Sequence, residues 1–244
     1  MKDKEIARGL LQKAIELDND LILAKSLLGK TYYSVGDFEN TMKIISSTLK
    51  QVKENGDKLW IGRSIRYIGM IHFEKGDYDK ALENYTRSNK IAKEIDDKLG
   101  IEKSLVSIGN VYWIKNDLDK ALDYFNHSLE IIEEIGNKLQ IGERFGNIGN
   151  VYAGKGDTFA KQRNWKEAIK QYDNALNYYK RYLTICEEFG NKEGVGTSLI
   201  NIGNVYGNRS DDDKALEYYS RSLKIQEALG NQLGIGFSLN NIGN

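Results

Sequence analysis

The heptapeptide SIGNVYW at residues 107–113 decides the fold, because close copies of it recur along the whole chain. The copies are LLGKTYY, YIGMIHF, NIGNVYA, NIGNVYG and a final NIGN, at residues 27–33, 67–73, 147–153, 201–207 and 241–244. Their glycines are 40 residues apart, except for 54 residues between Gly149 and Gly203. Self-similarity at a fixed period of this length predicts a solenoid, in which each unit packs only on its neighbours.

The composition limits the classes of protein and partner. The chain has 244 residues with 35 basic and 35 acidic side chains, 24 glycines, no proline and one cysteine. Zero formal charge gives no chain-wide field for nucleic acid or an anionic membrane, so neither is expected as a partner. Cys186 cannot form an internal disulfide, and the sequence has no run of about 18 apolar residues to cross a bilayer. We therefore expect a cytoplasmic protein made of helices that end at glycine turns.

Residues 98–137 illustrate one unit. A first helix is predicted by apolar residues at helical spacing, namely Leu105, Ile108, Val111 and Tyr112. A second helix is predicted by another apolar stripe, namely Ala121, Leu122, Phe125, Leu129 and Ile132. The turn between them falls at Asn116 and Asp117, and Gly136 closes the second helix before Asn137 caps the next one. The unit is a helical hairpin.

A glycine inside each first helix costs about 1 kcal/mol of helix propensity relative to alanine. Its recurrence at the same place therefore indicates a packing role. The second helix has a small residue 12 positions later, as in the pairs Gly69 with Ala81, Gly109 with Ala121, and Gly203 with Ala215. We expect these small residues to face each other and to let the two helices approach closely.

The spacing Leu105-x2-Ile108-Gly109-x2-Tyr112, followed by Ala121-x3-Phe125, resembles the tetratricopeptide repeat. The same pattern recurs at Leu199, Ile202, Gly203, Tyr206, Ala215 and Tyr219. The departures from it are Lys25 and Ile65 at the tryptophan position, His72 at a tyrosine position, and the missing proline. The 40-residue period is similar to the longer subtype found in kinesin light chains, spindle-orientation adaptors and bacterial signalling proteins. The resemblance implies an all-α, right-handed α-solenoid of antiparallel helical hairpins.

The repeats divide the chain as one array over residues 1–244. We expect an orphan second helix at 3–18, repeats at 20–56, 57–96, 97–136, 137–190 and 191–230, and a truncated repeat at 231–244. Both ends then fall inside repeats, and Phe237, Leu239 and Ile242 have no following helix to pack against. The simplest interpretation is a piece of a longer gene product. The alternative is self-association through the open C-terminal repeat.

The unit at 137–190 has 14 extra residues. Adding about seven residues to each antiparallel helix keeps their facing stripes in register, so we predict a hairpin that projects about 10 Å beyond its neighbours. Basic residues alternate with aromatic ones there, and the candidate docking residues are Lys161, Arg163, Trp165, Lys166 and Lys170. The alternative is that the aromatic side chains pack the hairpin together while the lysines form a solvated face.

In arrays of this family the first helices line the concave face. Asparagines are expected along it, in pairs three residues apart that share a helix side: Asn147 and Asn150, Asn201 and Asn204, and Asn241 and Asn244, with Asn110 alone. An amide has two donors and an acceptor oxygen, so such a row could hold the backbone of an extended peptide. The resemblance implies the same role. The alternative is that the asparagines bridge neighbouring helices.

The N-terminal part of the expected groove is basic and aromatic, with Arg63, Arg66, Lys103 and Trp113 near Met70 and Phe73. This chemistry suits a peptide with an acidic end. The alternative is that the cations pair with Glu74 or Glu102.

No catalytic constellation is present in the sequence. Two separated histidines, His72 and His127, and one cysteine give no metal-ligand spacing. We therefore expect neither an enzyme nor a cofactor or metal, but a scaffold that binds a protein or peptide. A second hypothesis is the regulatory or sensory arm of a larger signalling enzyme, such as a cyclase or a histidine kinase.

Overall fold

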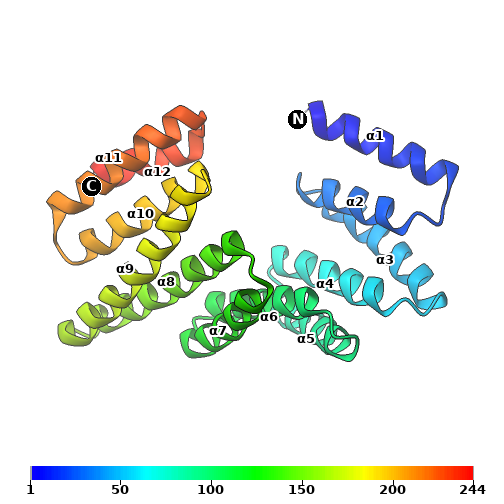
Figure 1. The fold of residues 1–244 in the computed structure, drawn as a ribbon, viewed down its shortest axis with the longest axis horizontal. Coiled ribbons are helices and arrows are strands. Elements are labelled where there is room, and N and C mark those ends of the chain that lie inside the picture. The colour runs from blue at the N-terminus through cyan, green and yellow to red at the C-terminus, as the bar shows by residue number, and fades with distance from the viewer. Residues whose placement is uncertain (1, 244) are drawn as a thin grey trace. The chain divides into compact units, whose positions relative to one another are not determined.

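The structure, a computed structural model, describes residues 2–243. These residues form twelve α-helices and no strand (Figure 1). The helices fall into two compact units, Met1–Lys115 and Asn116–Asn244.

Unit 1 is a stack of six antiparallel helices. They are α1 (Lys2–Leu17), α2 (Ile22–Tyr33), α3 (Phe38–Glu54), α4 (Lys58–Glu74), α5 (Tyr78–Glu94) and α6 (Lys98–Ile114). Each helix packs on the next one along the chain, and the first helices of the hairpins, α2, α4 and α6, also contact each other. Contact among first helices is expected on the inner side of a curved stack, so these three helices form its concave face.

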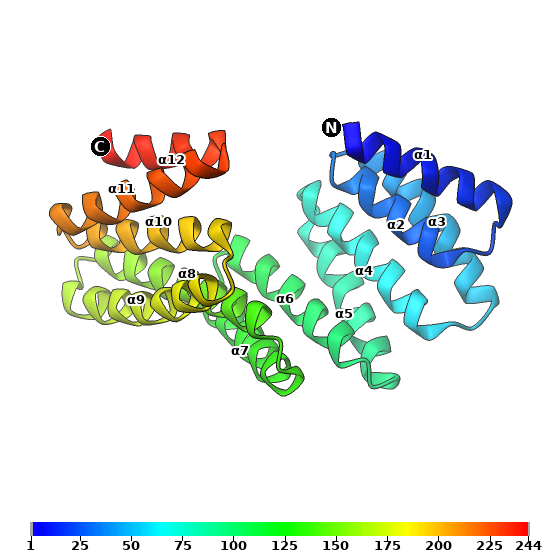
Figure 2. The same cartoon turned by 45° about the horizontal axis from the view of Figure 1, so that its top comes forward.

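Unit 2 has the same arrangement. Its helices are α7 (Leu118–Ile135), α8 (Lys138–Lys161), α9 (Trp165–Glu188), α10 (Lys192–Asn208), α11 (Asp212–Leu229) and α12 (Gln232–Gly243). The first helices α8, α10 and α12 contact one another in addition to their neighbours in sequence (Figure 2). The all-α fold of helical hairpins expected from the sequence is confirmed.

The turns follow the chemistry that the sequence predicts. Asp117 caps α7 by accepting a hydrogen bond from the Lys120 backbone N–H at 3.3 Å, and Asn137 caps α8 from Gln140 at 3.2 Å. Gly136 has a φ of 79°, the left-handed conformation that closes a helix. Four non-glycine residues adopt the same conformation after other helices: Asp96, Asn116, Arg163 and Ser210.

Tyrosine rings face Gly69, Gly149 and Gly203 of the first helices, whereas Gly29 faces the side chain of Ile45. A Cβ atom on Gly69 would lie 2.7 Å from Cε1 of Tyr85, and one on Gly203 would lie 2.5 Å from Cε1 of Tyr219. Real Cβ atoms do not approach other atoms so closely. The expected pairing with Ala81 and Ala215 is therefore wrong, because the residue that needs the space is the aromatic one four positions further along.

The long hairpin repeats this packing once more. Helices α8 and α9 have 24 residues each, whereas α6 and α10 have 17. Gly149 faces the ring of Tyr179, and seven residues further along α8 Gly156 faces the ring of Tyr172. Both tyrosines are buried. The insertion thus adds two helical turns to each helix together with a second glycine–tyrosine contact.

The last helix, α12, leaves an apolar side exposed. The side chains of Phe237 and Leu239 are 62% and 53% exposed, whereas Ile242 is partly buried. Self-association through this side stays a prediction.

Candidate functional site

Two asparagines on the concave side of unit 2 accept hydrogen bonds from buried tyrosines. The Tyr179 hydroxyl on α9 donates to Asn150 Oδ1 on α8 at 2.8 Å. The Tyr219 hydroxyl on α11 donates to Asn204 Oδ1 on α10 at 2.9 Å. Burial raises the pKa of both phenols, so each hydroxyl remains a donor. The two asparagines therefore have their amide oxygens directed at the core.

The same two oxygens link successive first helices. Asn201 Nδ2 on α10 lies 3.5 Å from Asn150 Oδ1, and Asn241 Nδ2 on α12 donates to Asn204 Oδ1 at 3.0 Å. The oxygen therefore faces two donors in each case, which fixes the orientation of the amide group. Within residues 5–243, Nδ2 of Asn150 and of Asn204 donates to no other residue. These asparagines bridge helices through their oxygens and keep their N–H donors available.

The other predicted asparagines lie on the same helices. Asn110 on α6 and Asn147 on α8 are partly buried and have no hydrogen-bond partner in the described part of the chain. Phe125 stands where Tyr85, Tyr179 and Tyr219 stand in other units, so Asn110 has no hydroxyl to orient it. Asn244 lies outside the described residues.

Asp157 continues the row on α8, and sequence reasoning missed it. Its Oδ1 accepts from the Tyr172 hydroxyl at 2.7 Å and from Asn208 Nδ2 at 2.8 Å. Asp157 thus repeats the role of Asn150 seven residues later. The signal was present in the sequence, because Gly156-Asp157 repeats Gly149-Asn150 at that spacing.

Unit 1 has a different feature on its concave side. Helices α2, α4 and α6, together with Asp97 just before α6, line a cavity of about 220 Å³. Four cations line it: the exposed Lys30, and Arg63, Arg66 and Lys103 next to the rings of Trp60 and Tyr67. Trp113, on the last turn of α6, is partly buried and lies outside the cavity lining.

Aromatic rings and a sulfur atom position the two guanidinium groups. Arg63 lies over the ring of Trp60 at 5.0 Å, and Arg66 lies over the ring of Tyr67 at 5.2 Å. Arg66 Nη1 is 3.4 Å from Sδ of Met70. Such stacking is a typical arginine contact and leaves the edges of the guanidinium group open to acceptors.

The three cations have no carboxylate partner. Glu74 accepts a hydrogen bond from the Tyr33 hydroxyl at 2.7 Å instead. Among residues 5–243, no ion pair joins Arg63, Arg66 or Lys103 to Glu74, Glu102 or any other acidic group. Burial lowers the pKa of Arg66 and of Lys103, and the charge of Arg66 lowers that of Lys103 further. The cavity therefore holds an excess of positive charge, which the negative charges of Glu102 and Asp97 offset only in part at Lys103.

The aromatic residues of the long hairpin mostly pack inside it. Tyr152 and Tyr178 stack with their ring centroids 5.6 Å apart, and Tyr172 and Tyr179 are buried. Two aromatic side chains at the ends of α9 are exposed, Trp165 at 57% and Phe189 at 48%.

The tip of that hairpin carries the five predicted docking residues. Lys161, Arg163, Trp165 and Lys166 are exposed, and Lys170 lies 3.4 Å from Glu167. Docking of a partner at this tip stays a prediction.

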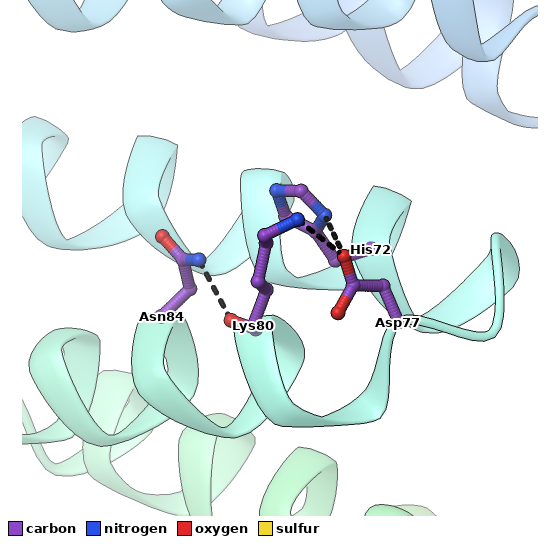
Figure 3. A network of polar contacts seen from close by, with 4 residues as sticks. All are labelled: His72, Asp77, Lys80 and Asn84. Carbon is purple, nitrogen blue, oxygen red and sulfur yellow. Dashed lines mark hydrogen bonds and ion pairs between the residues drawn. The ribbon is translucent and has the colours of Figure 1, made fainter.

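His72 belongs to a polar network at the turn between α4 and α5 (Figure 3). The Asp77 carboxylate lies 2.7 Å from Lys80 Nζ and 3.7 Å from His72 Nδ1. Asn84 Nδ2 donates to the Lys80 carbonyl at 2.8 Å. The hydrogen bond from Lys80 lowers the pKa of Asp77. The network stabilises a turn and presents no vacant ligand position.

Cys186 is buried against Val195 and Leu199, and burial raises the pKa of its thiol, so packing accounts for it. Between residues 2 and 243, no cluster of three or more histidine, cysteine or acidic side chains could hold a metal. Over the same range, no helix is both long enough and apolar enough to cross a membrane.

Comparison with known families gives consistent matches. A family model for the tetratricopeptide repeat matches residues 164–228, and a second model of the same description matches residues 68–95 and 102–135. No curated protein sequence matches the chain.

Solved structures share the fold at low sequence identity. BtubC from P. vanneervenii has a TM-score of 0.68 and 17% identity, covering 94% of this chain and 91% of its own. A signal-transduction ATPase with a tetratricopeptide repeat sensor, from Pyrococcus horikoshii, has a TM-score of 0.80 and 18% identity. It covers 98% of this chain, which spans only 34% of the ATPase. A Rap protein in complex with Competence and Sporulation Factor has a TM-score of 0.71 and 14% identity, over 88% of this chain and 57% of its own.

Proposed function

The chain is a tetratricopeptide repeat protein, an all-α scaffold for protein interactions, and we propose from this that unit 2 binds an extended peptide along α8, α10 and α12. The observation that carries the proposal is the orientation of Asn150 and Asn204. Their oxygens are held by Tyr179 and Tyr219, so the groups left for a ligand are N–H donors. On this reading unit 2 acts as a non-catalytic peptide-binding scaffold.

Donors of this kind suit the carbonyl groups of a peptide backbone. A carbonyl is an acceptor that every residue has, so the contact would hold the ligand without reading its side chains. Packed helices lie about 10 Å apart. An extended chain advances about 3.3 Å per residue, so each asparagine would meet about every third carbonyl of the peptide.

The tyrosine contacts allow a test that removes the N–H donors and keeps the oxygen acceptors, with one negative charge added at each position. In the double variant Asn150→Asp and Asn204→Asp, each carboxylate still accepts from its tyrosine and from the asparagine of the next helix. Asp157 shows that an aspartate fits this position, since it accepts from Tyr172 and Asn208 in the same way. The reverse change, Asp157→Asn, serves as the control because it keeps the oxygen acceptor.

The assay selects peptides from a random display library on the wild-type protein and then measures affinity by fluorescence anisotropy. We expect the Asn150→Asp/Asn204→Asp variant to lose at least about tenfold in affinity, while its thermal unfolding stays close to that of the wild type. A library from which the wild type enriches nothing, or equal binding by the double variant, would contradict the proposal.

One comparison favours a second candidate, the sensory arm of a larger signalling enzyme. The chain matches the ATPase that carries a tetratricopeptide repeat sensor over 98% of its own length but over only 34% of the ATPase. A repeat array of this size therefore occurs within a larger signalling protein. The coding sequence on both sides tests this candidate, since it requires a catalytic domain in the same reading frame.

A further inference from the structure

The cations of unit 1 follow the repeat. Arg63 on α4 and Lys103 on α6 are 40 residues apart and occupy the same place in successive units, and Arg66 lies one turn after Arg63. The other units have Leu23, Glu143, Thr197 and Phe237 at this place. The cationic row is therefore restricted to α4 and α6, whose helices contact each other and line one cavity.

This row has the properties of a binding site rather than of a solvated face. The two guanidinium groups lie on the rings of Trp60 and Tyr67, so their conformational freedom is already reduced. Placing partly buried cations together is unfavourable, because the charges repel and lose hydration. The attraction of Glu102 and Asp97 offsets this cost only in part, since the pKa of Arg66 and of Lys103 is lowered in spite of it. A bound anion would remove this repulsion.

The rest of the cavity wall is largely apolar. Leu23 and Leu27 of α2 and Leu99 near the start of α6 line it beside the cations. Leu23 and Leu27 are also among the exposed large hydrophobic residues of the chain. Two other charged residues line the cavity, the exposed Lys30 and Asp97, whose carboxylate caps the backbone N–H of Gly100 at 3.0 Å.

We propose that this cavity binds an acidic peptide segment, with the carboxylates of the peptide on Arg63, Arg66 and Lys103 and an adjacent apolar side chain against Leu23 and Leu27. All the residues belong to unit 1, so the site is separate from the asparagine row of unit 2 and does not depend on it.

The arrangement favours carboxylates over a single phosphate group. The cations lie on two helices, about 10 Å apart when packed, so they match separate acidic side chains better than one compact dianion. Asp97 in the wall also weighs against a doubly charged group. A nucleic acid would need a basic surface along its backbone, which a chain with 35 basic and 35 acidic side chains does not supply.

The test uses a random peptide display library on the intact chain. The wild type is expected to enrich peptides with an excess of aspartate and glutamate next to apolar residues. The triple variant Arg63→Gln/Arg66→Gln/Lys103→Gln should lose this acidic excess. The matched control, Arg87→Gln/Lys90→Gln/Lys93→Gln, changes the net charge equally at exposed positions of α5 and should keep it. Circular dichroism and thermal unfolding establish that both variants fold.

Affinity measurements then separate the possible ligands. A selected acidic peptide should bind the cavity variant at least about tenfold more weakly than it binds the wild type. An amide version of the peptide, with Asn and Gln in place of Asp and Glu, should show the same loss of affinity for the wild type. Raising the salt concentration should weaken the acidic peptide most, because screening shortens the reach of the charges.

Three results would overturn the proposal. They are a wild-type pool without acidic excess, an excess that survives in the cavity variant, and displacement of the acidic peptide by equal concentrations of an oligothymidylate or a phosphoserine peptide. The variant Asn150→Asp/Asn204→Asp is measured in parallel. Loss of binding there alone would concern the asparagine row, and loss in the cavity variant alone would concern the cationic cavity.

Discussion

Replacing Gly203 by alanine should destabilise unit 2, whereas the same change at Gly207, one turn further along α10, should stabilise it. Both glycines lie in α10 and near the same side chain, Tyr219, Gly203 in the interior of the helix and Gly207 in its last turn. They differ in the space beside them. A Cβ on Gly203 would lie 2.5 Å from ring carbon Cε1 of Tyr219, whereas one on Gly207 would lie 3.6 Å from its hydroxyl oxygen.

The expected magnitudes follow from two opposing terms. Glycine-to-alanine changes in a helix interior gain about 1 kcal/mol of propensity, and Gly207, which lies in the last turn of α10, should gain part of this amount. Forcing an extra group into a packed core costs about 1–3 kcal/mol. The ring of Tyr219 is 7% exposed and its hydroxyl is held by Asn204 at 2.9 Å, so it has little room to move. We therefore expect Gly203→Ala to lose about 1–2 kcal/mol overall.

Urea denaturation followed by far-ultraviolet circular dichroism measures both variants. The decisive comparison repeats Gly203→Ala in a Tyr219→Leu background, where the ring is gone. The effect of the alanine should then change sign and become stabilising. Equal effects at the two glycines, or a loss that persists without the ring, would refute the argument that the tyrosine requires the glycine.

Three further outcomes are expected. Ser210→Gly should raise the free energy of unfolding by about 0.5–1 kcal/mol, since Ser210 has a φ of 59°, and thermal denaturation measures it. Four turn aspartates have a carboxyl pKa below the ordinary value of 3.8: Asp37, Asp77, Asp117 and Asp211. In each case the main cause is a hydrogen bond donated by the side chain three residues further along the chain. A depressed carboxyl pKa contributes stability above the unfolded value that is lost as the pH falls, so the melting temperature should drop below about pH 4, and less so in the fourfold asparagine variant. Cys186 is buried with a raised pKa, so a thiol reagent should label it only after unfolding in urea.

The sequence predicted the helical hairpins well because each helix has its own local signals. The apolar stripes, the capping residues and the turn glycines are all read within a few positions of the chain. The partner of the helix glycine was predicted wrongly for a reason that is equally physical. Both Ala215 and Tyr219 recur at fixed distances from Gly203, so the period cannot tell which one faces it. The answer depends on how deeply the second helix packs, which no local pattern contains.

The candidate sites depended on contacts between residues far apart in the chain. Spacing placed Asn150 and Asn204 on one helix side, but only the hydroxyls of Tyr179 and Tyr219 decide which amide atom is free. Spacing likewise allowed Arg66 to pair with Glu74. Tyr33, which is 41 residues from Glu74, takes that carboxylate instead. Long-range competition of this kind is not visible in a sequence pattern.

The long hairpin shows how such a fold accepts an insertion. Seven residues in each helix add two turns, so the added segment must supply the same contacts as the one before it. It does so with Gly156 opposite Tyr172, and with Asp157 as the acceptor for the tyrosine hydroxyl. Because these residues satisfy the packing of the new turns, nothing in the fold requires an exposed tryptophan at the tip. Trp165 is 57% exposed in spite of this, so a role for it has to be sought outside the hairpin. Deleting the whole insertion would remove Asp157, which accepts the hydrogen bond of the Tyr172 hydroxyl. Trp165→Ala leaves the hairpin packing intact and therefore tests the tip alone.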